Sequence, residues 1–309
     1  MSPAIVLSMK AFIQLTLSIF GVTLLTGCGE ELDHNKIRQN GFVYCGQGGP
    51  TSFNPQLVDS GITSETLSPQ LFDTLLTLDS NNFKPIPNLA TSWSVNKAGT
   101  EYTFNLRKGV KFQKTAWFTP KRPMNAEDVV FSFRRIIDSS HPYHYVGSGL
   151  YPWFSGIDFQ NLLIDVKAIS EYQVRFTLSR PDNTFLSNIA TSHAVIHSAE
   201  YASMLELTDD KAMLDSHPVG TGPFYLDDFQ VNDLVRLKRH NEYWKGRPKM
   251  AQVVFDISHR GTGTLAKLLR NECDVLNSPL SSQIPIIEQQ DDIESVSYTH
   301  LRAHETIQH

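Results

Sequence analysis

The 309-residue sequence lacks any cluster of positive charge. It has 27 Lys and Arg against 32 Asp and Glu, a formal net charge of −5, and these basic residues form no contiguous run. Proteins that bind nucleic acid neutralise phosphates with grouped Lys and Arg. The sequence therefore argues against a nucleic-acid partner.

The chain also lacks the motifs of common enzymes and metal sites. No H-E-x-x-H, G-x-S-x-G or C-x-x-C occurs. The pairs His141/His144 and His193/His197 have spacings that suit a metal, but neither has an obvious third ligand. Glu127 and Asp128 stand in the first turn of a predicted helix, where the helix dipole explains them without catalysis. We expect no enzyme activity, no cofactor and no metal site.

Long hydrophobic runs are absent as well. The longest apolar stretch, Ala11–Leu25, follows Lys10 and is shorter than the roughly 20 residues of a membrane-spanning helix. It has the length of a signal-peptide core, which predicts export and a signal peptide over 1–27. Residues 25–28, LTGC, resemble a lipobox, so we expect a lipid on Cys28 and a polar tether over 28–40. The alternative is a plain signal peptide in which Cys28 is incidental.

Cysteine is scarce. Of the three cysteines, Cys45 and Cys273 remain once Cys28 is assigned to the lipid. An even pair in an exported protein favours a disulfide, because the compartment outside the inner membrane is oxidising.

The region with the clearest periodicity is 88–137. Alternating apolar residues on both sides of the turn 96–99 predict a β-hairpin. Asn125, with Asp128 three residues later, predicts the start of a helix whose apolar residues continue to Ile137.

The rest of the chain alternates strands and helices. We expect a first strand at 42–45 and a helix from Leu67 through Leu76. Gly220 and Gly222 are expected to adopt backbone torsions that a side chain would forbid. Further expected elements are hairpins at 166–168 with 173–178 and at 224–229 with 234–237, helices at 183–190 and 199–207, and a β-α-β unit at 251–257, 264–270 and 273–276.

Several motifs carry a family resemblance. A-x-S-W, Y-x-F-x-L-R-x-G-V-x-F and N-A-E-D-V-V-F-S-F follow one another within 88–137, and G-T-G-P-F and N-x-Y-W-x-G follow at 220–246. This order resembles the family 5 extracellular solute-binding proteins, which serve peptide, dipeptide and nickel importers. The segment FQKTAWFTP, 112–120, resembles the peptide-binding members most closely.

The resemblance implies an α/β fold of the two-lobed periplasmic binding protein type II, with only lobe I present here. Lobe I would span 41–295, with a mixed-sheet subdomain at 41–82 plus 215–295 and an inserted subdomain at 83–214. Residues 296–309 resemble the translation of a sequencing adapter and are predicted to be non-native. The residues that meet the termini of a bound peptide would lie in the missing lobe II.

The function implied is capture of oligopeptides or dipeptides, with antimicrobial peptides and haem as further ligands, in the periplasm. The partners would be an inner-membrane ABC permease and its ATPase, and the protein would be a monomer. Alternatives are a ligand-sensing lipoprotein that signals to a membrane partner, and a nickel-binding importer component. By resemblance the ligand cleft is lined by five consecutive residues, Asp59, Ser60, Gly61, Ile62 and Thr63. A solvated turn is the alternative for this segment.

Overall fold

The computed structural model describes residues 37, 39–46, 48–257, 261–277 and 279–296. The predicted signal peptide, Cys28 and residues 297–309 of the predicted tail lie outside these ranges. Within them, no helix has both the length and the apolar character needed to cross a membrane.

One mixed sheet has the strand order β11-β1-β10-β9-β8. Strand β1 runs parallel to its neighbours β10 and β11, whereas β9 runs antiparallel to β10 and β8. The β-α-β unit was therefore predicted with the right direction, but β1 lies between its two strands. The strands of this sheet are β1 (Gly41–Gly46), β8 (Phe224–Gln230), β9 (Leu234–Arg239), β10 (Gln252–Ile257) and β11 (Val275–Leu276).

A second sheet has the order β4-β5-β7-β6 and is antiparallel throughout. Both hairpins predicted for this region are confirmed. Asn96 forms the first turn, where its side-chain oxygen accepts a bond from the Thr100 amide at 2.9 Å. The strands are β4 (Ala90–Val95), β5 (Glu101–Leu106), β6 (Leu163–Ser170) and β7 (Gln173–Leu178). Two short strands, β2 (Leu76–Leu78) and β3 (Pro85–Pro87), pair separately.

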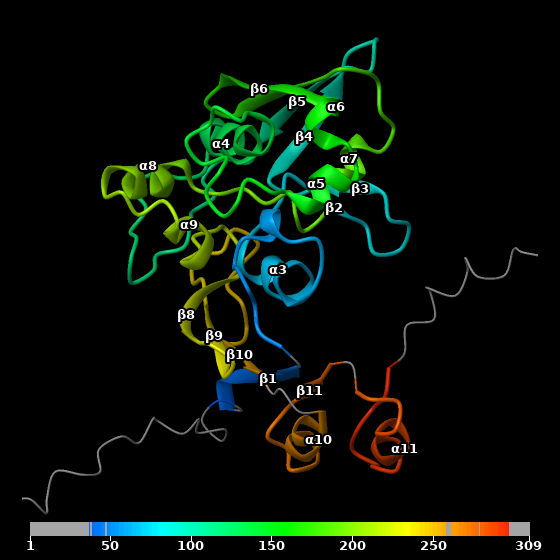
Figure 1. Cartoon of the computed structure of the whole chain (residues 1–309). Helices are drawn as coiled ribbons and strands as arrows, with labels where there is room; N and C mark the ends of the chain where they lie inside the picture. Colours follow the sequence, from blue (N-terminus) through cyan, green and yellow to red (C-terminus); the bar gives the residue numbers. More distant parts are fainter. Residues whose placement is uncertain (1–36, 38, 47, 258–260, 278, 297–309) are drawn as a thin grey trace, which may run out of the picture. The chain divides into compact units, whose positions relative to one another are not determined.

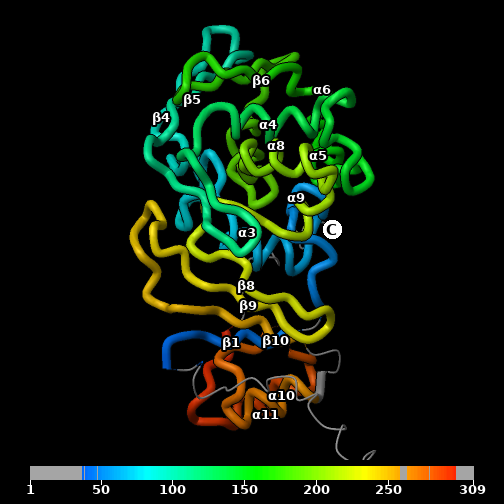
Figure 2. Tube along the Cα trace, turned by 90° about the vertical axis from the view of Figure 1, so that its left-hand side faces the viewer, coloured from blue at the N-terminus to red at the C-terminus, as the bar shows by residue number. Residues whose placement is uncertain are grey.

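Helices cover both sheets (Figures 1 and 2). Helix α4 packs on β6 and β7, while α3 contacts β8 and α10 contacts β1 and β11. The helices are α3 (Ser68–Leu71), α4 (Ala126–Ile137), α5 (Pro152–Gly156), α6 (Phe159–Leu162), α7 (Phe185–Asn188), α8 (Ala199–Leu207), α9 (Met213–Ser216), α10 (Gly261–Leu269) and α11 (Ile284–Ile287), with the short turns η1 (Pro55–Leu57) and η2 (Thr63–Leu67).

Two hydrophobic cores result. The larger core lies beside the four-stranded sheet, where the rings of Phe104, Phe133 and Phe176 meet edge to face with centroids 4.9 to 5.3 Å apart. The smaller core lies between the five-stranded sheet and α3, and includes Leu71 and Phe255. Each sheet thus buries the apolar face that its alternating sequence pattern predicts.

The helix expected from Leu67 through Leu76 ends at Leu71, because Phe72 is already extended with φ −130° and ψ 163°. Leu76 instead opens strand β2. The buried Asp73 carboxylate accepts bonds from Thr221 Oγ1 at 3.0 Å and Trp244 Nε1 at 2.8 Å. These tertiary contacts outweigh the helical spacing of the leucines.

Cys45 and Cys273 are joined in a disulfide, with their Cα atoms 5.8 Å apart. The same region is held by backbone bonds from Asp274 to Val43 at 2.8 Å and from Asn277 to Cys45 at 3.0 Å. The cross-link therefore fixes β1 to the segment that leads into β11.

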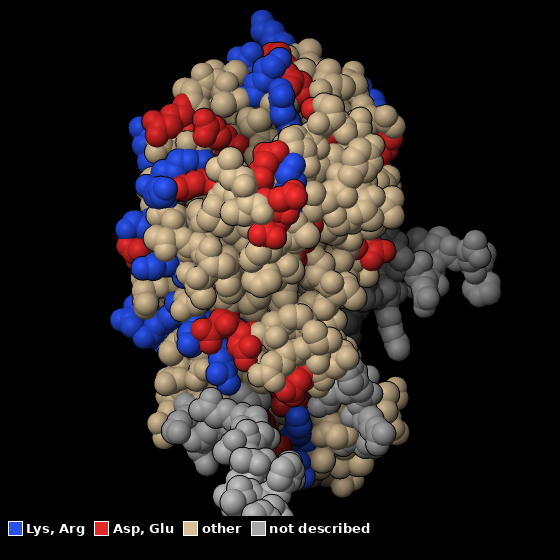
Figure 3. Space-filling view, turned by 60° about the vertical axis from the view of Figure 1, so that its left-hand side comes forward, with Lys and Arg blue, Asp and Glu red and all other residues tan. Residues whose placement is uncertain are grey.

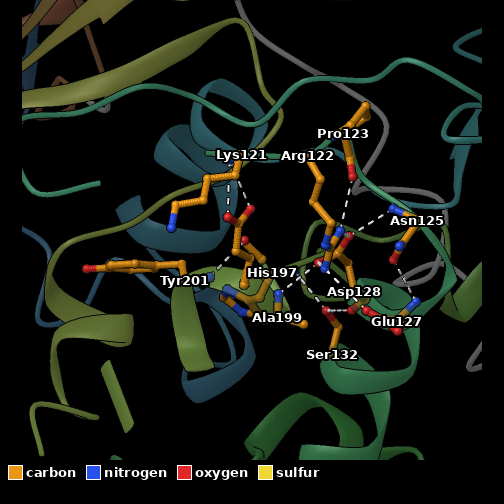
Figure 4. A network of polar contacts seen from close by, with 12 residues as sticks. Lys121, Arg122, Pro123, Asn125, Glu127, Asp128, Ser132, His197, Ala199 and Tyr201 are labelled. Carbon is orange, nitrogen blue, oxygen red and sulfur yellow. Dashed lines mark hydrogen bonds and ion pairs between the residues drawn. The ribbon is translucent and has the colours of Figure 1, made fainter. Parts of the chain in front are cut away.

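The predicted cap of α4 is confirmed and extends beyond the helix (Figure 4). Asp128 accepts from the Asn125 amide at 2.8 Å, which completes a capping box. Its carboxylate also accepts hydrogen bonds from both terminal nitrogens of the Arg122 guanidinium, at 2.7 and 2.9 Å, and from the Ala199 amide at 2.8 Å. One fully buried side chain thus joins the start of α4 to a loop and to the start of α8.

Replacing Asp128 with Ala should lower the free energy of unfolding by about 3 kcal/mol, because a buried ion pair is broken and two backbone donors lose their acceptor. Urea unfolding measures this. The matched control is Glu127→Ala: that side chain is 72% exposed and lies 3.7 Å from Arg122, so its loss should cost less than about 0.5 kcal/mol. Equal losses in the two variants would contradict this account.

Gly220 and Gly222 are needed for a reason other than the one predicted. Neither has a positive φ. A Cβ on Gly220 would lie 2.1 Å from the Leu71 carbonyl oxygen, and one on Gly222 would lie 2.6 Å from the Gln70 carbonyl oxygen. Two backbone segments therefore cross in direct contact, and any side chain would separate them.

Gly220→Ala should cost at least about 2 kcal/mol of folding free energy, since backbone atoms cannot move aside as a side chain could. Gly156→Ala is the control, because a Cβ there meets nothing within 4 Å. Chemical denaturation of both variants checks the difference; an unchanged midpoint for Gly220→Ala would disprove the close crossing.

Candidate functional site

The segment Asp59–Thr63 lies at the surface, between a buried loop and η2. Asp59, Ser60 and Gly61 are exposed, Ile62 is half-buried and Thr63 is buried. Gly61 has φ +90°, a conformation that favours glycine. Thr63 fixes the inner end of the segment, because its hydroxyl donates to the Ser52 carbonyl at 2.6 Å. The segment thus presents three accessible residues from an anchored base.

A pocket of about 730 Å³ begins at Val58, the residue before this segment. Its walls come from the loop 50–58, from Trp117 and Gly147, from the region of α9 and from β8. The lining residues are Pro50, Thr51, Ser52, Phe53, Leu57, Val58, Trp117, Gly147, Ala212, Asp215, Ser216, His217, Leu226, Asp227, Asp228 and Phe229.

The charged side chains that line this pocket are all acidic: none of the described lining residues is Lys or Arg. Asp227 is paired with Lys238 at 2.9 Å, and Asp228 accepts from Gln230 at 3.1 Å. Aromatic rings add apolar surface, with Phe53 and Phe229 edge to face at 5.0 Å, and Trp117 and His217 at 5.2 Å. Carboxylates beside aromatic rings suit a ligand that carries amino or guanidinium groups on an apolar frame.

Asp215 is the most deeply buried of these carboxylates, at 8% exposure. Its Oδ1 accepts from Asn54 Nδ2 at 2.7 Å and lies 3.4 Å from the buried Arg135 guanidinium of α4. Its carbonyl accepts from the Phe53 amide at 2.9 Å and the Ser52 hydroxyl at 3.2 Å. Burial raises the pKa of this carboxyl, while Arg135 and Asn54 oppose the rise. Asp215 therefore holds the loop that leads to Asp59.

His193 lies beside the same segment. Its ring stacks on Trp153 of α5 with centroids 4.6 Å apart and an interplanar angle of 4°. Burial lowers the pKa of His193, and the nearby Asp59 and Glu65 carboxylates partly oppose this. The loop 141–156 thus reaches the segment through Trp153, although its own Tyr143, Tyr151 and Phe154 are buried in the larger core.

The sequence did not identify Asp215, Asp227 or Asp228 as site residues. Asp215 meets Asn54 and Arg135 across separations of 161 and 80 residues, so no local motif marks it. The histidine pairs serve other contacts: His144 Nδ1 lies 2.7 Å from the Arg135 carbonyl and His197 Nε2 lies 3.2 Å from Asn54 Oδ1. Among the described residues, no group of three or more His, Cys, Asp or Glu could hold a metal ion.

A comparison of the sequence with models of known protein families shows the family to which the chain belongs. The model of the bacterial extracellular solute-binding proteins, family 5 (middle region), matches residues 84–305. The chain belongs to this family. The resemblance found in the motifs is therefore confirmed, and with it the α/β fold of the family's periplasmic binding proteins.

Relatives of the chain include proteins named for peptide transport, in keeping with the resemblance of the segment 112–120 to peptide-binding members. The peptide transport periplasmic protein SapA of Salmonella typhimurium is 46% identical over 81% of this chain and 46% of its own length. Heme-binding protein A of Haemophilus influenzae is 38% identical over 85% of this chain and 50% of its own length.

A solved structure agrees. The dipeptide binding protein of Pseudoalteromonas sp. SM9913 in complex with Met-Leu has a TM-score of 0.79 and 42% identity, covering 81% of this chain and 50% of that one. The chain spans about half the length of these relatives.

The pH dependence of stability tests the environment of His193. Because its folded-state pKa is lowered, its contribution to stability is present above the unfolded pKa of about 6.5 and is lost as the pH falls toward the folded-state pKa. We expect His193→Gln to lose less stability than the wild type between about pH 7.5 and pH 5. Urea unfolding at both pH values gives the two differences, and parallel pH profiles would contradict the assignment.

Proposed function

We propose that this chain is the ligand-facing first lobe of the substrate-binding component of a peptide ABC importer. It captures oligopeptides or dipeptides in the periplasm and delivers them to an inner-membrane permease with its ATPase. Antimicrobial peptides and haem belong to the range of ligands.

The names of the relatives support this role. SapA of Salmonella typhimurium and the dipeptide-binding protein of Escherichia coli, 39% identical, are both named for peptide transport or binding. Heme-binding protein A, 38% identical, supports haem as a second ligand class. These names describe transport and binding proteins, in keeping with a chain that binds its ligand without transforming it.

The observation that carries the proposal is the position of Asp59–Thr63. The residue before the segment, Val58, lines the acidic and aromatic pocket, and the base of the segment is anchored through Ser52. An extended peptide can pair its backbone with such a segment and place side chains in the adjoining hollow. Backbone pairing of this kind depends little on the sequence of the peptide.

The remaining parts of the proposal concern the whole protein. The mixed-sheet subdomain (41–82 plus 215–295) and the inserted subdomain (83–214) together form lobe I, and hinge closure onto lobe II buries the ligand. The protein is a monomer held at the membrane by a lipid on Cys28.

Calorimetry of the full-length protein with mixed dipeptides, a cationic helical peptide, haem and nickel tests the function. We expect heat with the peptides. Nickel is included among the tested ligands because two solved structures of nickel-related proteins share the fold at 23% and 19% identity. Heat with nickel alone, or no heat with any peptide, would overturn the peptide assignment.

Ser60→Trp tests the segment itself. A bulky ring on an exposed position should block an extended ligand and weaken peptide binding by roughly tenfold or more, about 1.4 kcal/mol. Ser94→Trp, at an exposed serine on β4, is the matched control and should bind as the wild type does. Equal affinities in both variants would remove Asp59–Thr63 from the binding site.

A further inference from the structure

Two segments without a basic run of their own form one basic surface after folding. The first, 107–111, follows β5, and the second, 239–250, connects β9 to β10. Lys111 Nζ donates to the Glu242 carboxylate, and the Arg107 guanidinium lies 4.4 Å from the centre of the Trp244 ring. The two segments, more than a hundred residues apart, are therefore in contact.

This basic surface has a strong excess of positive charge. Its two segments contain seven basic residues and one acidic residue, Glu242, which is already paired with Lys111. Asp73 is buried; its carboxylate accepts bonds from Thr221 and Trp244 and lies 3.8 Å from Lys245 Nζ, which it partly neutralises. The basic residues are Arg107, Lys108, Lys111, Arg239, Lys245, Arg247 and Lys249.

The rest of the chain has the opposite sign. Outside the basic surface, 20 Lys and Arg face 31 Asp and Glu across the sequence. Figure 3 shows most charged residues of one face along its top and left-hand edge, where Asp and Glu lie among the Lys and Arg. A local excess of positive charge, such as that of the two segments, orients a protein in an electric field with that surface toward a negative partner.

Aromatic rings at the basic surface distinguish between two kinds of anionic partner, lipid headgroups and single-stranded nucleic acid. The Trp244 ring is half-buried and carries Lys245 Nζ at 4.8 Å as well as Arg107, and Lys108 Nζ lies 5.4 Å from the Tyr172 ring. Cations next to Trp and Tyr are typical of surfaces that meet lipid headgroups. Single-stranded nucleic acid needs free aromatic faces on which bases stack, whereas the Trp244 ring already carries two cations.

We propose that this basic surface docks on anionic phospholipid headgroups. The lysines and arginines contact headgroup phosphates, and Trp244 and Tyr172 lie at the level of the headgroups. This contact is independent of the ligand bound near Asp59–Thr63, and it holds whether or not the peptide assignment is right.

Vesicle flotation of the chain from residue 29 onward tests the proposal without a lipid anchor and without the predicted signal peptide. Vesicles contain phosphatidylcholine alone, or phosphatidylcholine and phosphatidylglycerol in equal parts. The test variant is Lys108→Gln, Lys245→Gln and Lys249→Gln together. The matched control replaces three exposed lysines outside the basic surface, Lys84, Lys97 and Lys121, with Gln.

We expect the wild type and the control to bind the vesicles that contain phosphatidylglycerol. The test variant should bind about a hundredfold more weakly, since each cation near an anionic surface contributes about 1 kcal/mol. Binding should also fall as the salt concentration rises. Thermal melting of both variants confirms that they fold.

Four results would overturn the proposal. They are equal binding of the two triple variants, equal binding to both kinds of vesicle, no vesicle binding by the wild type, and stronger binding to a labelled RNA duplex than to anionic vesicles.

Discussion

The side chain of Gln113 connects the end of α3 to the segment 220–224 through hydrogen bonds to their backbones. It is fully buried. Its Nε2 group lies within bonding distance of the carbonyls of Leu71, Gly222 and Phe224, at 2.8, 3.2 and 2.6 Å, and its Oε1 accepts from the Gly220 amide at 2.9 Å. An apolar residue here would leave these backbone groups buried without their partner, which is costly. The amide reaches all of them only because the glycine backbone touches the end of α3. The position of β8, and hence of one pocket wall, depends on this crossing.

Other buried polar groups fix the opposite pocket wall. Asp215 binds Asn54 through its side chain and Phe53 through its carbonyl, so the loop before Asp59 is attached to α9. Arg135 in turn connects Asp215 to α4. Buried charges are stabilising only when their partners are in place, so these contacts favour one arrangement of the loop. The exposed residues Asp59 to Gly61 extend from this anchored base, which suits a binding edge that has to meet a ligand in a fixed orientation.

The sequence predicted elements whose cause is local. The hairpin at Asn96 and the capping box of Asn125 depend on residues within five positions of one another. Prediction from the sequence failed where contacts with residues far along the chain determine the local structure. The expected helix through Leu76 ends early because Asp73 binds Thr221 and Trp244, far along the chain. The acidic pocket was missed for the same reason, since its walls come from five separate segments. Motif resemblance proposed the segment Asp59–Thr63 as part of the ligand cleft, whereas its anchoring through Ser52 is visible only in the structure.

The net charge of the whole chain does not describe the charge of each part of its surface. A net charge of −5 without a basic run argues against a nucleic-acid partner. Folding nevertheless brings Lys111 against Glu242 and Arg107 against Trp244, so two segments that together contain seven basic residues and one acidic residue are in contact. Carboxylates gather separately around the pocket near Asp59. Electrostatic attraction between exposed charges decays over about 10 Å in salt, so a partner responds to the local surface and not to the total. A single chain can therefore attract a cationic ligand at one surface and an anionic membrane at another.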